Sequence, residues 1–234
     1  MYRSNLAGVS TDYVVRLEQG RGLRPSVEVL EALATALRLA PDERAYLFDL
    51  AQQRQPNAGK PAETAAPALV RLVADLSPLP AMLVNHRNDI LSWNPEMARL
   101  LVDFDTLPPR QRNTIWLCLK HPLMRENFYA DRERLLREGI ADLRAAWAAN
   151  PEDQVLVDMI AEFRTGDAEF ERLWAKRDVK VNARGTKVMR HPEVGPVAVQ
   201  YEVLMPLQDP DQRLVIYRAS DAESQAALDR LCAQ

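Results

Sequence analysis

The first fifty residues carry apolar side chains at three- and four-residue spacing, which is the period of an amphipathic helix. Serine or proline precedes each apolar group, at Ser10, at Pro25–Ser26 and at Pro41–Asp42. Serine can cap the first turn of a helix, and proline is suited to its first position. The pattern therefore predicts three short helices. Their apolar stripes are Val14 and Leu17, then Val29, Leu30, Leu33 and Leu37, then Leu47, Leu50 and Ala51.

The apolar period stops at a segment that has the composition of an exposed linker. Gln52 to Pro67 holds three prolines and one glycine, and it has no large aliphatic side chain. We expect the domain boundary to lie there. The chain then divides into an N-terminal helical domain over residues 1–51, a linker over 52–67 and a C-terminal domain over 68–234.

Beyond the linker, the pattern first predicts strands and then helices. Short apolar runs at Ala81–Asn85 and Asp89–Trp93 flank three polar residues, which predicts a β-hairpin. Helical spacing returns from Asn94 and is clearest between Asp131 and Trp147. Two further helices are expected after it. Asn150–Pro151 is predicted to cap and begin the first of them, and Asp167 to cap the second.

The period then changes from helical to two, as in a half-buried strand. Val197, Val199, Tyr201, Val203 and Met205 alternate with smaller or more polar residues. Flanking strands are expected at 186–191 and 213–217, and a closing helix at 221–231. The order of two strands, several helices, three strands and one helix favours an α+β fold. We expect an antiparallel sheet covered on one side by helices.

Composition narrows the function classes without choosing one. The chain has 234 residues, of which 47% are hydrophobic, so it can bury a real core. No apolar run approaches the roughly 20 residues of a membrane-spanning helix, and no signal-peptide core is seen, so a cytoplasmic location without membrane contact is expected. The two cysteines and three histidines are scattered, and no motif of an active site accompanies them. Neither a metal site nor an enzyme is predicted.

The most specific motif in the chain lies between Ala7 and Gly22. Gly8 suits a tight turn between two helices, and Ser10 can cap the helix that follows. Side chains on the outer face of that helix would enter a DNA major groove, and two arginines after it would contact phosphates. The groove residues are Thr11, Asp12, Tyr13 and Arg16, and the phosphate contacts are Arg21 and Arg24. The surplus of arginine in residues 1–26 is small, so a helical bundle that never touches nucleic acid stays an alternative.

Residues 3–51 resemble the phage-repressor-like, or Xre-type, helix-turn-helix family. The resemblance rests on the segment from Ala7 to Gly22, on Arg24-Pro-Ser, on Val29-Leu-Glu-Ala-Leu-Ala34 and on Leu37-Arg-Leu39. In that family the first helix and most of the second come before the position of Ala7. Here they are missing, so the N-terminal domain is a remnant without its first helix. Either the true start lies upstream, or the chain has lost its DNA reader.

The C-terminal region, from about Ala68 to Leu231, resembles the PAS-like ligand-binding domain of MmyB-like regulators. The motifs are Pro80-Ala-Met-Leu-Val-Asn, Trp93-Asn-Pro-Glu-Met-Ala98, Arg112-Asn113, Leu173-Trp174 with Asp178-Val179, and His191-Pro-Glu-Val-Gly195. The resemblance implies an antiparallel sheet packed with helices, and a fatty-acyl or similar apolar ligand. One position departs from the family, because Arg177 stands where a histidine is usual before Asp178-Val179.

A pocket between the sheet and the long helices would be lined by aliphatic and aromatic side chains with a few polar groups. The candidate walls are Trp147, Phe163, Phe170, Trp174, Tyr201 and Met205. Each of them can equally be a plain core residue. Arg144 and His191 are candidate partners for a ligand carboxylate. Arg144 can also be a solvated surface residue, and His191 can stabilise a turn.

These patterns together favour a cytoplasmic, homodimeric transcription regulator that binds operator DNA and responds to an apolar small molecule. Dimerisation is expected because such readers gain affinity by occupying two half-sites. No cofactor is expected apart from a bound fatty acid or similar molecule. The alternative is a lipid-binding sensor that no longer binds DNA and acts through protein partners.

Overall fold

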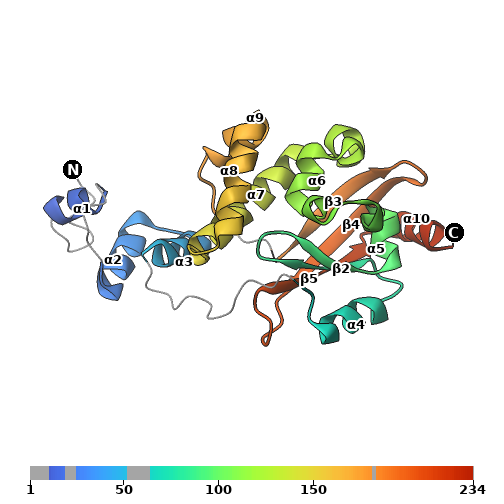
Figure 1. Cartoon of the computed structure of the whole chain (residues 1–234), viewed down its shortest axis with the longest axis horizontal. Helices are drawn as coiled ribbons and strands as arrows, with labels where there is room; N and C mark the ends of the chain where they lie inside the picture. Colours follow the sequence, from blue (N-terminus) through green and yellow to red (C-terminus); the bar gives the residue numbers. More distant parts are fainter. Residues whose placement is uncertain (1–10, 19–24, 52–63, 181–182, 234) are drawn as a thin grey trace.

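The computed structural model describes residues 11–18, 25–51, 64–180 and 183–233. Three helices at the N-terminal end precede an antiparallel sheet that is flanked by further helices (Figure 1). The last helix, α10 (Ala222–Cys232), returns to the sheet and packs on its fourth and fifth strands. The architecture is α+β, as the order of elements in the sequence predicted.

The N-terminal helices begin where the sequence places their caps. They are α1 (Thr11–Glu18), α2 (Val27–Leu37) and α3 (Pro41–Leu50). The Ser26 hydroxyl accepts a hydrogen bond from the backbone N–H of Val29 at 3.4 Å. At the start of α3 the Glu43 carboxylate accepts one from the backbone N–H of Ala40 at 2.8 Å. Each cap satisfies a donor that the first turn of a helix leaves unpaired.

Five strands form one sheet in the order β2-β1-β5-β4-β3, and every neighbouring pair is antiparallel. The predicted hairpin is confirmed as β1 and β2, and the predicted C-terminal strands are confirmed as β3, β4 and β5. Their bounds are β1 Ala81–Asn85, β2 Ile90–Trp93, β3 Arg184–His191, β4 Gly195–Leu204 and β5 Gln212–Ala219.

Helices cover both faces of part of this sheet, so the prediction of helices on one side was wrong. Helix α4 (Pro67–Asp75) packs on the face formed by Ala81 and Leu83 of β1 and by Leu214 and Ile216 of β5 (Figure 1). The intervening residues of both strands point into the main core on the other face. Strands β1 and β5 are therefore buried on both sides, which explains why their sequences are continuously apolar rather than alternating.

The remaining helices lie on the opposite face from α4. They are α5 (Pro95–Leu100), α6 (Thr114–Lys120), α7 (Arg132–Ala149), α8 (Gln154–Gly166) and α9 (Ala168–Trp174). Short helical turns at Phe104–Thr106, Pro109–Gln111 and Met124–Phe128 connect them. Asn94 and Asp167 cap α5 and α9 as predicted. The predicted cap of α8 was wrong.

The residue that caps α8 is Asp153, and Asn150 instead ends α7. The Asp153 carboxylate accepts a hydrogen bond from the backbone N–H of Leu156 at 3.1 Å. The side-chain amide of Asn150 donates to the carbonyl of Ala146 at 2.8 Å. Asparagine suits either end of a helix, so the Asn-Pro pair alone did not decide which end it marks.

Helices α6, α7, α8 and α9 enclose a second core. Its buried members include Leu143, Ile160, Phe163, Phe170 and Trp174. Helix α7 takes part in both cores, with Leu136 in this one and Leu135 packed against the core beneath the sheet. Helix α3 of the N-terminal unit packs against α7 as well. Helix α7 thus contacts the sheet, the helices α6 and α9, and the N-terminal unit.

Candidate ligand cavity and DNA-reading helix

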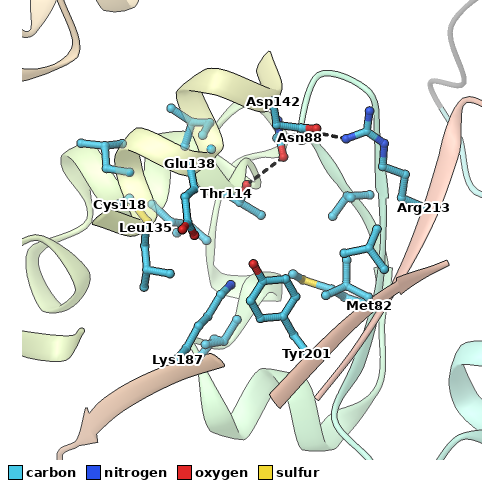
Figure 2. A pocket seen from close by; sticks show the side chains of 18 of the residues that line it. Met82, Asn88, Thr114, Cys118, Leu135, Glu138, Asp142, Lys187, Tyr201 and Arg213 are labelled. Carbon is cyan, nitrogen blue, oxygen red and sulfur yellow. Dashed lines mark hydrogen bonds and ion pairs between the residues drawn. The ribbon is translucent and has the colours of Figure 1, made fainter. Parts of the chain in front are cut away.

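A cavity of about 230 Å³ lies between the sheet and helices α6 and α7. Its walls are mostly apolar, and they come from strands β1, β3, β4 and β5 and from both helices (Figure 2). The apolar and sulfur-bearing wall residues include Met82, Val84, Leu101, Ile115, Leu117, Cys118, Met124, Leu135, Leu136, Val203, Met205 and Val215. A concave, apolar site with a few polar groups is the usual form of a small-molecule site.

Two glycines shape the walls of this cavity. A Cβ added at Gly185 of β3 would lie 2.7 Å from the ring and hydroxyl of Tyr201, its cross-strand partner on β4. A Cβ at Gly139 of α7 would lie 2.8 Å from Cδ1 of Ile115 on α6. The Tyr201 ring therefore lies in space that only a glycine leaves free, and α6 approaches α7 closely at Gly139.

Charged groups are few in the cavity, and most are paired. Arg213 of β5 bonds to Asp142 of α7 with Nη1 and Oδ2 2.6 Å apart. Glu138 of α7 lies 3.2 Å from Arg134, one turn earlier on the same helix. The first pair links α7 to β5, and the second lies within α7. The pair of Arg213 and Asp142 is marked in Figure 2.

Lys187 of β3 is the remaining charged side chain of the lining. Its Nζ donates to the hydroxyl of Tyr217 at 2.8 Å and lies 4.8 Å from the ring centroid of Tyr201. Burial acts to lower the pKa of Lys187, interactions with Tyr217, Cys118 and Tyr201 act to raise it, and the net shift is upward. The ordinary pKa of a lysine lies far above neutrality, so this half-buried side chain carries a positive charge at pH 7.

The thiol and phenol groups of the lining do not form a nucleophilic centre. Burial raises the pKa of the Cys118 thiol and raises that of the Tyr129 phenol well above its ordinary value. Both groups are therefore neutral at physiological pH, and a thiol is a weak nucleophile in that form. Among the described residues, no cluster of histidine, cysteine and carboxylate side chains is arranged to hold a metal ion.

The structure brings two of the eight sequence-selected ligand residues to the cavity, namely Tyr201 and Met205. Five others, Arg144, Trp147, Phe163, Phe170 and Trp174, pack in or against the core of α7, α8 and α9. His191 lies elsewhere, at the end of β3, where its Nε2 is 3.0 Å from the carbonyl of Arg99. Aromatic stripes at helical spacing face neighbouring helices here, rather than the sheet.

Sequence reasoning missed the polar lining, and above all Lys187. The signal for it was present in the strand pattern. Gly185, Lys187 and Met189 alternate on one face of β3, opposite Tyr201, Val199 and Val197 of β4. Because Met189 and the three β4 residues are buried, that face is the inner one, and a lysine on it is unusual.

Of the six sequence-selected DNA contacts, two have described side chains. Tyr13 is half-buried and Arg16 is exposed, and both lie on α1. Thr11 and Asp12 also belong to α1. Arg21 and Arg24 lie outside the described residues. An exposed arginine on this helix is available to a nucleic acid.

The N-terminal unit and the C-terminal domain meet where α3 packs on α7, at Tyr46 and Arg144. Burial lowers the pKa of Arg144, and the interaction with Tyr46 acts in the opposite direction. Residues of the same helix α7, including Leu135, Gly139 and Asp142, line the cavity. The helix that contacts α3 is therefore also a wall of the cavity.

The fold and the cavity define the class of protein as a ligand-binding α+β sensor joined to a helical DNA-binding unit. Residues 65–231 match the model of the MmyB-like transcription regulator ligand binding domain, and the chain belongs to that family. Residues 4–47 match a helix-turn-helix domain. This architecture is that of a ligand-responsive, DNA-binding transcription regulator. Comparison with curated proteins finds no match to the chain.

None of the helices in the described part of the chain has the length and apolar character needed to cross a membrane.

Proposed function

We propose that this protein is a cytoplasmic, homodimeric regulator that binds a fatty-acyl or similar apolar molecule and reads operator DNA with α1. The cavity is the observation that carries the proposal. Its walls are aliphatic, aromatic and sulfur-bearing side chains, with polar groups at a few positions. Such a surface gains free energy by excluding water when an alkyl chain fills it. No cofactor beyond this ligand is required.

The proposed response runs through α7. A ligand in the cavity contacts residues 135–142 on one side of this helix, while Arg144, two residues further along, contacts Tyr46 of α3. A ligand that binds one placement of α7 better than another shifts the population toward it. The helix-turn-helix units of a dimer would then change their spacing or mobility, and with it their fit to two half-sites.

DNA contact is assigned to the outer face of α1 and to the arginines that follow it. Thr11, Asp12, Tyr13 and Arg16 are proposed to meet base edges, and Arg21 and Arg24 to meet phosphates. Arg16 is the most direct test among them because its side chain is exposed. Arginine paired with a guanine edge is the commonest specific contact, and its loss costs about 1–3 kcal/mol.

The first test is native mass spectrometry of freshly purified protein, followed by fluorescence anisotropy with DNA from upstream of its gene. We expect a dimer, a co-purified apolar molecule, and DNA affinity that changes when the molecule is removed. Arg16→Ala should weaken DNA binding about tenfold. Arg71→Ala, which removes an exposed arginine from α4 of the sensor, is the matched control and should leave affinity unchanged.

Two results would overturn parts of the proposal. If no apolar molecule binds, the assignment of the cavity is wrong. If an apolar molecule binds but DNA does not, the protein is instead a lipid-binding sensor that acts through protein partners.

A further inference from the structure

The cavity contains one charged side chain that the fold itself does not neutralise. Lys187 reaches into the apolar wall from β3, with Nζ 4.8 Å from the ring centroid of Tyr201 and 5.0 Å from that of Tyr217 (Figure 2). The faces of both rings attract a cation, but they do not replace an anion. Lys187 is half-buried, and a cation that is partly removed from water without a counter-charge is stabilised when an anion binds next to it.

The carboxylates of the lining are engaged elsewhere. Asp142 pairs with Arg213 at 2.6 Å, and Glu138 pairs with Arg134 at 3.2 Å. In the part of the chain that the structure describes, Lys187 is not within ion-pair distance of any carboxylate, and its hydrogen bond goes to the neutral hydroxyl of Tyr217. Within the lining, Asp142 and Arg213 neutralise each other, Glu138 is paired with Arg134 outside the lining, and Lys187 is a further positive charge.

Donors around Lys187 remain available to a ligand. An ammonium group has three protons, and Tyr217 accepts one of them at 2.8 Å. The Tyr217 hydroxyl, having accepted from Lys187, can still donate its own proton. Lysine and tyrosine therefore present donors to the same point at one side of an otherwise apolar cavity. An oxygen-bearing anion is the chemical group that such donors suit.

We propose that Lys187 and Tyr217 bind the carboxylate head group of the ligand, so that the cavity selects free carboxylic acids over neutral lipids of equal chain length. This inference rests on the proposed function, which places an apolar ligand in the cavity. It adds that the ligand is negatively charged and that Lys187 and Tyr217 bind the charged group. Charge-assisted hydrogen bonds are about twice as strong as neutral ones, so the preference should be large.

The test compares dodecanoic acid with 1-dodecanol, which share a chain and differ in the charge of the head group. Isothermal titration calorimetry at pH 7.5 gives both affinities for the wild-type protein and its variants. We expect the wild type to bind the acid about ten- to a hundredfold more tightly than the alcohol. Lys187→Met should bring this ratio close to one, mainly by weakening binding of the acid. Lys187→Arg, which keeps the charge, should retain a preference for the acid.

Lys120→Met is the matched control. Lys120 bonds to Asp167 at 3.1 Å outside the cavity lining, so its removal should leave the ratio unchanged. Glu138→Gln removes a negative charge from the lining and should bind the acid at least as tightly as the wild type. If the function of Lys187 were instead to pair with Glu138, Lys187→Met would keep the preference for the acid, and that result would overturn the inference.

A measurement on the wild-type protein avoids any dependence on folding of the variants. The pKa of carboxyl-labelled dodecanoic acid, followed by ¹³C NMR, should be lower in the complex than in free solution because an ammonium stabilises the carboxylate. An unchanged or higher pKa overturns the inference, as does equal binding of acid and alcohol. If neither dodecanoic acid nor 1-dodecanol binds, both the inference and the proposed function fail. Binding of both without selectivity leaves the proposed function standing.

Discussion

The guanidinium carbon of Arg144 lies 3.9 Å from the ring centroid of Trp174, and its Nη2 donates a hydrogen bond to the carbonyl of the same residue. Trp174 is the last residue of α9, and its carbonyl also accepts a hydrogen bond from the backbone N–H of Arg177 at 3.2 Å. Arg144 therefore joins α7 to the end of α9 by stacking and by hydrogen bonding at once. Because Arg144 lies in this core and not in the cavity, we expect it to affect the free energy of unfolding rather than ligand binding.

Arg144→Leu should lower the free energy of unfolding by about 1–3 kcal/mol, because the Trp174 carbonyl loses a charged donor in a buried place. Urea unfolding measures this change. Arg172→Leu is the control, since Arg172 pairs with Glu133 on the surface and should contribute at most about 1 kcal/mol. Affinity for dodecanoic acid should be the same in both variants. Loss of ligand binding without loss of stability would show that Arg144 contacts the ligand.

Tyr46→Phe should reduce the effect of ligand on DNA affinity while leaving ligand affinity itself unchanged. The substitution removes one hydroxyl from the contact between α3 and Arg144, and it leaves the cavity lining intact. Anisotropy titrations with and without dodecanoic acid measure the coupling. In Tyr46→Phe, Arg144→Leu and the double variant, the losses of coupling should not add if both residues act in one contact. If the ligand changes the DNA affinity of Tyr46→Phe as much as that of the wild type, the contact between α3 and α7 does not transmit the effect of the ligand.

Gly185→Ala should weaken binding of dodecanoic acid and 1-dodecanol alike by several-fold. The new Cβ would lie 2.7 Å from the Tyr201 ring, which then moves into the cavity and fills part of it. Gly166→Ala is the matched control because nothing lies within 4 Å of its Cβ position, at the end of α8. It should keep wild-type affinity and gain up to about 1 kcal/mol of stability. Equal affinities in the two variants would contradict the assigned shape of the wall.

Most elements could be predicted from the sequence because their signals are local. Ser26, Asn94 and Asp167 each cap the helix that they were expected to cap. The alternation from Val197 to Val203 marks β4. Helix α4 was missed because it begins at Pro67, the last residue of a segment that has the composition of a linker, and its burial depends on strands far along the chain.

The cavity could not be predicted because it depends on which faces of distant elements meet. Trp174 and Tyr201 are equally good candidate walls in the sequence, yet one packs among α7, α8 and α9 and the other lines the cavity. The long helix α7 has apolar side chains on more than one face, and periodicity does not say which face meets the sheet. Lys187 can be recognised as an inward-facing lysine only when β3 is paired with β4.

A last prediction concerns the contact that fixes the β1–β2 hairpin to α8. Asp153 accepts hydrogen bonds from Nε and Nη2 of Arg87 at 2.7 and 2.8 Å, and its Oδ2 lies 2.7 Å from Nε2 of His86. All three side chains are buried. Burial acts to raise the pKa of Asp153, but the hydrogen bonds from Arg87 and His86 outweigh it and the pKa is lowered.

Because the pKa of Asp153 in the folded protein is below the unfolded reference of 3.8, the unfolded state takes up a proton first as pH falls. The stability that Asp153 contributes is complete above that pH and is lost as pH falls through the lower, folded value. Asp153→Asn should cost about 3–5 kcal/mol at pH 7, since it leaves Arg87 buried without a counter-charge. The amide oxygen of the asparagine can still cap α8, so the loss of unfolding free energy measures the effect of the missing negative charge.

Urea unfolding of the wild type and of Asp153→Asn between pH 7 and pH 3 tests this expectation. The difference between the two should be constant from pH 7 to about pH 4 and should shrink below it. Asp158→Asn is the control, because Asp158 is exposed and accepts its hydrogen bond from Gln154 of the same helix at 2.7 Å. A difference that stays constant down to pH 3, or that grows on acidification, would contradict the lowered pKa of Asp153, because the unfolded state alone would take up a proton in this range.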